Sequence, residues 1–278
     1  MSVIMQISDP HFGTEQPQVM AGLTSLVKQQ KPNLLVLSGD ITQRARPAQF
    51  HAARRFMDSL HVPFLAIPGN HDIPLLNIWS RLSNPYARHI AAFGSELEPF
   101  YSSPDMMIIC VNTTRAWRHK HGELSAQQIA RVTDLLSQAS AEQLRIIVVH
   151  QPIAVTRAKH KVHLLRGHSE ALPAWSAAGA DLVMGGHIHL PYVLPLAGLA
   201  RPTWAVQAGT AVSSRVRSGV PNSVNILRWG VHAKMGGCHI EQWDFSAKES
   251  NFEIVKLSEV HPLNHKLNSQ NNGSPPCS

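Results

Sequence analysis

Short apolar runs alternate with segments of helical periodicity along the first seventy residues. The runs at 3–7, 34–37 and 64–67 are apolar except for Gln6, which is typical of strands buried on both faces. Between them, apolar residues recur at helical spacing over 19–27 and 50–60. Alternation of strand and helix favours parallel β-α-β units, so we expect a parallel sheet covered by helices.

The alternation continues to residue 184 and then changes character. Further strands are predicted at 107–111, 145–149 and 181–184, and Ser125 with Gln128 forms a capping-box pattern in front of a helix through 129–136. Four later runs, 204–208, 224–227, 239–245 and 252–257, have no helices between them and suggest an antiparallel or mixed second sheet. We expect an α/β fold with two sheets packed face to face and helices on the outside.

Length and composition favour one domain. With 278 residues, 44% of them hydrophobic, the chain can bury a sizeable core. We expect a single domain over 1–263 and a disordered tail over 264–278, where Asn, Ser and Pro are frequent. A signal peptide, a membrane span and a disulfide framework all lack a sequence signal, and the three Cys are far apart. A cytoplasmic protein is therefore expected.

Charge and histidine content point to an anionic ligand. The formal net charge is +7 with His neutral, which suits an anionic substrate. Basic residues form no run of five or six, and no extended basic stretch carries stacking aromatics, so nucleic acid is a disfavoured partner. The 17 His residues matter only where a motif places them, because His is the commonest metal ligand and also an ordinary core or surface residue.

Metal-competent side chains follow five of the predicted strands. They are Asp9 and His11, then Asp40, then Asn70 with His71 and Asp72, then His150, and finally His187 and His189. The first three groups are one β-α-β unit apart, and in open α/β sheets ligands bind beyond the carboxyl ends of the strands. Each motif alone is weak, but five strand ends with ligand types predict one shared metal site. Oxygen and imidazole ligands without thiolate favour Mn²⁺, Fe²⁺/Fe³⁺ or Zn²⁺ over Ca²⁺.

The same motifs resemble a known family. Asp9-Pro10-His11, Gly39-Asp40, Gly69-Asn70-His71-Asp72, His150 and Gly186-His187-Ile188-His189 are similar, as a complete and ordered set, to the motifs of the calcineurin-like metallophosphoesterases. Within that family, segments 39–43, 69–74 and 208–211 resemble those of bacterial class III cyclic-nucleotide phosphodiesterases. The resemblance implies a four-layer α/β sandwich of two mixed sheets flanked by helices, and it implies hydrolysis of phosphodiesters such as 3′,5′-cyclic AMP.

The resemblance also implies a role for each motif residue. One metal ion would be held by Asp9, His11 and His189, the other by Asn70, His150 and His187, and Asp40 would bridge them. A hydroxide between the ions would attack phosphorus. His71 would bind no metal and would act as the catalytic side chain that stabilises the phosphoryl charge or protonates the leaving oxygen. Asn70, His71 and His189 would also contact the substrate.

Three alternatives keep this chemistry and change the substrate: a phosphomonoesterase, a nuclease, or a pyrophosphatase acting on a nucleotide-linked lipid. A fourth is a binding protein without turnover, which is disfavoured because no ligand is missing. Loop residues that could meet the anionic substrate are Arg44, Arg115, Arg118, His119, His121 and Arg166. We expect a small phosphoester as the main partner and leave a homodimer open.

Overall fold

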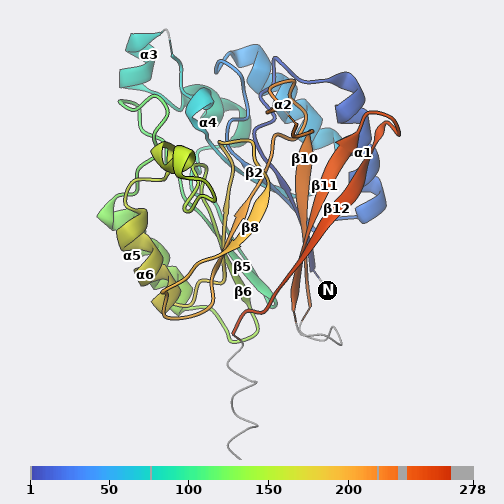
Figure 1. The fold of residues 1–278 in the computed structure, drawn as a ribbon. Coiled ribbons are helices and arrows are strands. Elements are labelled where there is room, and N and C mark those ends of the chain that lie inside the picture. The colour runs from blue at the N-terminus through green and yellow to red at the C-terminus, as the bar shows by residue number, and fades with distance from the viewer. Residues whose placement is uncertain (1, 76, 218, 231–236, 264–278) are drawn as a thin grey trace, which may run out of the picture.

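Two six-stranded mixed sheets form the centre of the molecule (Figure 1). The computed structural model describes residues 2–75, 77–217, 219–230 and 237–263, and the tail predicted at 264–278 lies outside this range. In the first sheet the strand order is β12-β11-β10-β1-β2-β3. Its strands are β1 (Ser2–Ile7), β2 (Leu34–Ser38), β3 (Phe64–Ile67), β10 (Ser223–Trp229), β11 (Cys238–Ser246) and β12 (Asn251–Val260). As predicted, β1, β2 and β3 are parallel.

The second sheet has the order β4-β5-β6-β7-β9-β8. Its strands are β4 (Phe100–Ser103), β5 (Met106–Cys110), β6 (Leu144–Val148), β7 (Leu182–Gly185), β8 (Tyr192–Pro195) and β9 (Trp204–Gln207). The four central strands β5, β6, β7 and β9 are parallel, whereas β4 and β8 pair antiparallel at the edges.

The prediction that the late strands build the second sheet is wrong for three of the four. β9 joins the second sheet as a parallel neighbour of β7, and β10 crosses back to pair antiparallel with β1. β11 and β12 then extend the first sheet through hairpin pairing. Runs without intervening helices do predict antiparallel neighbours, but they do not specify which existing sheet edge accepts them.

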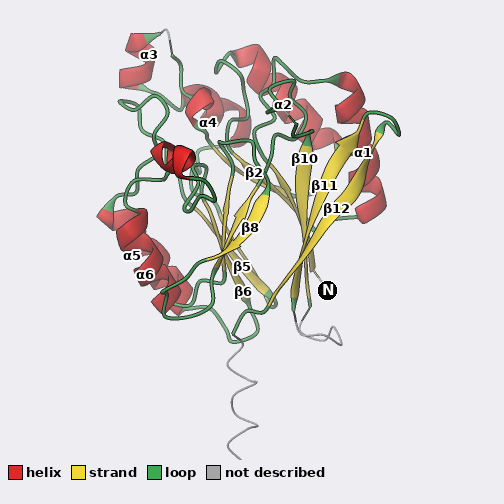
Figure 2. Cartoon of the chain, viewed as in Figure 1, coloured by secondary structure: helices red, strands yellow, loops and turns green. Residues whose placement is uncertain are grey.

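Helices cover both outer faces, which gives four layers (Figure 2). The helices are α1 (Pro17–Gln30), α2 (Pro47–Ser59), α3 (Ile78–Ser83), α4 (Ala87–Phe93), α5 (Ala126–Ser137) and α6 (His168–Ala177). α1 and α2 pack on the first sheet, and α5 and α6 pack on the second. The predicted capping box is present, because the Ser125 side chain accepts from the backbone N–H of Gln128 at the start of α5. No described helix has the length and apolar character needed to cross a bilayer.

Alternation along each strand decides which core a side chain joins. Val3 and Met5 of β1 face the α1/α2 layer, whereas Ile4 between them faces the second sheet. In the same way, Ile146 of β6 packs between the sheets and Ile147 packs against α5 and α6. The central strands are therefore apolar on both faces, as the sequence predicts, and this fixes the loops at their carboxyl ends with little freedom.

Candidate metal centre

Loops from both sheets meet at the carboxyl ends of their strands. The backbone N–H of Asp9 after β1 donates to Gly39 O after β2 over 3.1 Å, and His11 N–H donates to Asp40 O over 3.0 Å. The backbone N–H of His187 after β7 donates to Asp9 Oδ2 over 2.9 Å, which joins the second sheet to the first. The sequence prediction that these loops share one edge is therefore met in three dimensions.

Left-handed backbone conformations concentrate at this edge. Asp9, His11, Asp40, His187 and His189 all have positive φ, between 44° and 71°. Such conformations are uncommon for residues with a Cβ, and they cluster at functional sites where surrounding structure enforces them. Backbone segments also approach one another closely here, because a Cβ added at Gly69 would lie 2.0 Å from Asp40 N and one added at Gly186 would lie 2.0 Å from Ser8 Oγ.

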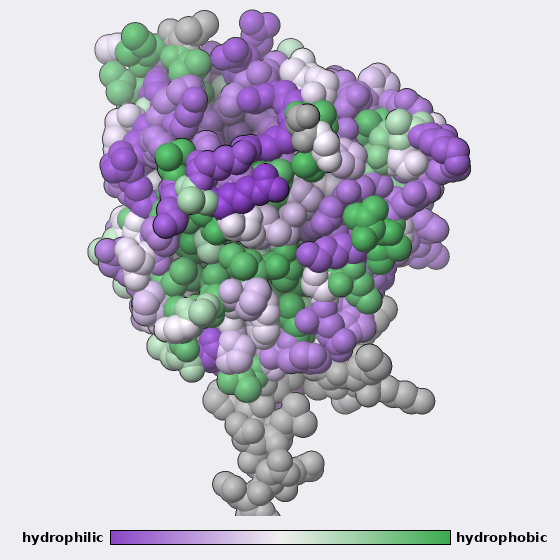
Figure 3. Space-filling model, in the orientation of Figure 1, coloured by the Kyte–Doolittle hydropathy of each residue, from purple (hydrophilic) through white to green (hydrophobic). Residues whose placement is uncertain are grey.

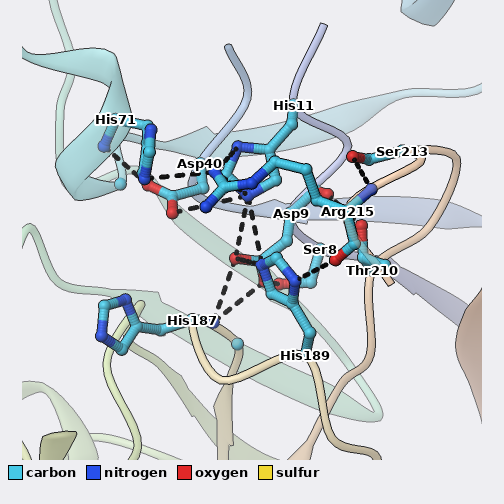
Figure 4. Close-up of polar contacts among 12 residues, drawn as sticks. Ser8, Asp9, His11, Asp40, His71, His187, His189, Thr210, Ser213 and Arg215 are labelled. Atoms are coloured by element: carbon cyan, nitrogen blue, oxygen red, sulfur yellow. Dashed lines mark hydrogen bonds and ion pairs between the residues drawn. The ribbon is translucent and has the colours of Figure 1, made fainter. Parts of the chain in front are cut away.

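Asp9, His11 and His189 form a first cluster of potential ligands. One donor atom of each lies within 4.8 Å of the other two. His189 Nε2 is 3.2 Å from Asp9 Oδ1 and 3.1 Å from His11 Nε2 (Figure 4). All three residues are buried. Two imidazole nitrogens and a carboxylate oxygen that converge in this way are typical ligands of a divalent cation.

Asp40, His150 and His187 form a second cluster by the same criterion. His150 Nε2 is 3.2 Å from Asp40 Oδ1, whereas Asp40 Oδ2 lies 3.8 Å from His11 Nε2 of the first cluster. The two oxygens of Asp40 thus face different clusters, which is the arrangement that a bridging carboxylate requires.

Three buried atoms, two from the second cluster and one from Asn70 on the same cavity lining, have no hydrogen-bond partner among the described residues. They are Asn70 Oδ1, from the short 3-10 helix η1 (Asn70–Asp72), together with His150 Nε2 and His187 Nδ1. Buried polar atoms are nearly always satisfied, and leaving one unsatisfied costs about 1–3 kcal/mol. A cation bound by these three atoms would satisfy them together, so this donor set fits a metal ion.

Hydrogen bonds to the opposite ring nitrogen orient the imidazoles. His150 Nδ1–H donates to Ser38 O over 3.0 Å, and His189 Nδ1–H donates to Arg215 O over 2.7 Å. A carbonyl oxygen only accepts, so in each ring the proton resides on Nδ1 and the Nε2 lone pair faces the site. His187 is reversed: its Nε2 lies 3.2 Å from His163 Nδ1, and its Nδ1 faces the second cluster.

Electrostatics favour ionised carboxylates at this edge. Burial would raise the pKa of Asp9, but the His189 and His150 imidazoles outweigh it and lower the pKa to about 2. Burial is outweighed at Asp40 in the same way, chiefly by His150, and its pKa lies well below the usual range. Burial would lower the pKa of His150, but Asp40 raises it to about 9. Ligation needs the unprotonated Nε2, so metal binding would displace the second proton that Asp40 favours on His150.

The clusters lie at the base of a cavity of about 420 Å³. In Figure 3 the upper part of this face is mostly hydrophilic and is hollowed near its centre. The described lining residues are Asp40, Asn70, His71, Lys120, His163, His187, Ile188, His189, Arg215, Val216 and Arg217. A cavity of this size is in the range of small-molecule sites.

Arg215 extends across the cavity toward both clusters (Figure 4). Its Nη1 donates to Gln43 Oε1 over 3.0 Å and lies 3.2 Å from His71 Nε2 and 3.2 Å from His11 Nδ1. His71 is held from its other side, because its Nδ1–H donates to Gln43 O over 2.9 Å. The guanidinium and the His71 ring therefore face the same space above the clusters.

Sequence reasoning missed the cationic residues of the cavity. None of the six loop residues proposed for substrate contact is among its described lining residues. Arg118 instead pairs with Glu123, and Arg115 donates to Gln128 Oε1 over 2.6 Å. Lys120, His163, Arg215 and Arg217 occupy the cavity wall in their place. They come from irregular loops and a 3-10 helix, where no hydrophobic period marks which side chains turn inward.

Asp72 stabilises the loop and takes no part in either cluster. Its carboxylate accepts from the backbone N–H groups of Gly69, Ile41 and Thr42 over 2.8, 2.9 and 2.7 Å, and from Thr42 Oγ1 over 2.8 Å. These bonds tie the loop after β3 to the loop after β2. Asp72 thus positions Asp40 and Asn70 from behind.

Two facing mixed sheets with two ligand clusters at a shared edge match the architecture of a metal-dependent phosphoesterase, and the sequence comparison agrees. The chain belongs to the calcineurin-like phosphoesterase family, whose sequence pattern matches residues 2–191, more than half of the chain. It is 27% identical over 202 residues to a probable cyclic nucleotide phosphodiesterase from Synechococcus sp., covering 68% of this chain and 74% of the relative. It is also 27% identical over 172 residues to the glycerophosphodiester phosphodiesterase GpdQ of Enterobacter lignolyticus, covering 56% and 59%.

Solved structures show the same fold at low sequence identity. A dimetal phosphatase from Danio rerio superposes with a TM-score of 0.68 at 13% identity, covering 94% of this chain and 99% of that one. A purple acid phosphatase from yellow lupin also gives 0.68 at 13% identity, covering 94% and 53%. The four-layer architecture expected from the motifs is thereby confirmed.

Proposed function

We propose that this protein hydrolyses phosphodiesters with two metal ions. One ion would be held by Asp9, His11 and His189, the other by Asn70, His150 and His187, with Asp40 between them. The observation that carries this proposal is the pair of buried clusters joined by Asp40 at the base of one cationic cavity. The names of both sequence relatives concern diesters, which supports a diester over a monoester.

The donor set favours Mn²⁺, Fe or Zn²⁺, since imidazole and carboxylate ligands occur together without thiolate. When bound, two such ions would supply Lewis-acid charge at the phosphoryl oxygens and lower the pKa of a bound water. Side chains of the cavity would bind the diester, orient it and assist departure of the leaving oxygen.

Arg215 and His71 are positioned for that work. The Arg215 guanidinium presents planar N–H donors to the space above both clusters, which matches the oxygens of a phosphoryl group. His71 Nε2 faces the same space, and its Nδ1–H is anchored on Gln43 O. We assign Arg215 to the phosphoryl oxygens and His71 to the phosphoryl or leaving oxygen, with Asn70 and His189 as further substrate contacts at the cavity base.

The decisive experiment compares substrates with and without metal. Purified protein is loaded with Mn²⁺, and its metal content is measured. Turnover of bis(p-nitrophenyl) phosphate, p-nitrophenyl phosphate and 3′,5′-cyclic AMP is then followed before and after chelation. We expect two ions per chain and diester turnover that chelation abolishes. Hydrolysis of the monoester alone would make the protein a phosphatase, and no turnover with two ions bound would refute the proposal.

A further inference from the structure

A second cavity opens beside the one above the metal clusters. Its volume is about 510 Å³, and its described lining residues are Arg157, Lys159, His160, Leu190, Arg217, Gly219 and Val220. We call it the basic annex. Arg217 lines both cavities, and Leu190 directly follows His189 of the first cluster. His160 and His163 lie on the same 3-10 helix, η2 (Ala158–His163), one at each cavity. The two spaces therefore share one wall.

The charge of the basic annex has no internal counterpart. Its described lining contains two Arg and one Lys and no acidic residue. Among the described residues, no carboxylate forms an ion pair with Arg157, Lys159 or Arg217. Surface cations usually find a carboxylate or spread over the surface. Three cations that line one cavity without a carboxylate partner among the described residues create a positive potential that an anion would neutralise.

The Arg217 guanidinium is held in place by a neutral imidazole. Its Nη1 lies 3.3 Å from Nε2 of His160, which is buried. Burial, followed by the charges of Arg217, Lys159 and Arg157, lowers the pKa of His160, so its Nε2 accepts the guanidinium N–H. His160 thus orients Arg217 at the wall between the cavities, and no carboxylate of the described residues neutralises its charge.

We infer that the basic annex binds a second phosphate group of the substrate. The preferred substrates would then be phosphodiesters that carry a further phosphate on the same molecule, as in a nucleoside 3′,5′-bisphosphate ester. This inference rests on the proposed function, because it assigns the scissile diester to the metal clusters. A 3′,5′-cyclic nucleotide has one phosphate and would leave the basic annex unused, so it ranks below such substrates.

The test uses two chromogenic diesters that differ in one phosphate. Thymidine 5′-(p-nitrophenyl phosphate) has only the scissile diester, and its 3′-phosphorylated analogue adds the second anion. We expect the 3′-phosphate to lower KM about tenfold, as expected for charge-assisted hydrogen bonds. The double variant Arg157→Ala/Lys159→Ala changes exposed residues of the basic annex alone. It should remove this advantage and leave KM for the first diester within twofold.

A charge-matched control separates local binding from general attraction. Lys28→Ala/Arg55→Ala removes two exposed cations from α1 and α2 and should retain the tenfold preference. Equal KM values for the two diesters in the unmodified protein would overturn the inference, as would equal losses in both double variants. A KM that keeps falling as the 3′ end is extended to oligonucleotides would also overturn it, because the occupant would then be a nucleic-acid backbone.

Binding of the product tests the basic annex without turnover. Calorimetry on the Mn²⁺-loaded protein compares thymidine 3′,5′-bisphosphate with thymidine 5′-monophosphate. Tighter binding of the bisphosphate, lost in Arg157→Ala/Lys159→Ala, supports the inference even if the diesters are not hydrolysed. Equal binding of both nucleotides refutes the inference even if bis(p-nitrophenyl) phosphate is hydrolysed. Failure of the proposed function and failure of this inference are therefore distinguishable.

Discussion

The ligand clusters and the rim of the cavity are built in opposite ways. We use rim for Lys120, His163, Arg215 and Arg217. The cluster residues follow parallel strands and are mostly buried, and five of the six adopt left-handed backbone conformations. The rim residues come from connecting loops and η2, and their side chains are partly or fully exposed. Chemistry is thus fixed by the fold, whereas substrate choice is left to segments that can vary without disturbing it.

This contrast makes a general prediction. A change in a cluster should alter metal content and reduce turnover of every substrate alike. A change at the rim should leave metal content intact and alter substrates unequally. The variants below test where the boundary lies, from the largest expected effect to the smallest.

Asp40→Asn should have the largest effect, because the proposed function makes Asp40 the ligand between the two metal ions. The amide keeps an acceptor for the His71 backbone N–H, which donates to Asp40 Oδ1 over 2.8 Å, so the loop should fold. Loss of the charge should reduce metal content to one ion or none and diester turnover on the order of 10⁴-fold. Asp58→Ala, an exposed carboxylate on α2, is the matched control and should keep two ions. Two tightly bound ions in Asp40→Asn would show that Asp40 does not bridge.

His71→Ala should retain both metals and lose about 10³-fold in turnover, within the range of acid–base assistance. Metal retention is expected because His71 contributes only its backbone N–H to Asp40. The measurements are metal content and kcat on bis(p-nitrophenyl) phosphate. Unchanged kcat would refute the catalytic role of His71, and loss of an ion would move His71 into the metal site.

Arg215→Ala should cost about 10²-fold in kcat/KM, the scale of losing one preorganised donor to a phosphoryl oxygen. His189 should keep its orientation, because its Nδ1–H donates to the backbone carbonyl of Arg215 and truncation leaves that carbonyl in place. Arg215→Lys keeps the charge without the planar fork and should recover part of the loss. A fall in metal content in Arg215→Ala would contradict the division between rim and clusters.

His163→Ala should have the smallest effect and lies on the boundary. His163 Nδ1 is 3.2 Å from His187 Nε2, so it orients a ligand from outside the cluster. Removing such a partner should weaken the affinity of one metal ion by about tenfold. Turnover at saturating Mn²⁺ should remain near normal. His51→Ala, an exposed histidine of α2, is the control. Equal Mn²⁺ titration curves for the two variants would remove His163 from the support of the metal site.

The strand ends could be predicted because two constraints coincide there. A strand buried on both faces produces a nearly continuous apolar run, and the polar loop that follows marks its end. Asp9, Asp40 and Asn70 stand at such ends, and parallel pairing of β1, β2 and β3 brings them together. The family motifs then supplied the pairing of His150 and His187 across the second sheet.

The sequence did not allow us to predict which sheet each late strand joins or which residues form the rim of the cavity. β9 and β10 are both short apolar runs, yet one continues the second sheet and the other returns to the first. Burial does not separate them, because Val206 of β9 and Leu227 of β10 both pack in the core between the sheets. Arg215 and Arg217 lie in a loop and are separated by one apolar residue, Val216. No local sequence pattern distinguishes an Arg that faces a cavity from one that faces solvent.

The left-handed backbone at the strand ends also limits how this site can change in natural variation. Every site residue with positive φ is Asp or His, and Asp, Asn and His accept that conformation more readily than other residues with a Cβ. Exchange among these types can alter ligand charge and metal preference without rebuilding a loop. Glu or a β-branched residue at these positions would strain the left-handed backbone, whatever its ability to bind a metal. The backbone conformation therefore favours Asp, Asn and His at these positions of the site.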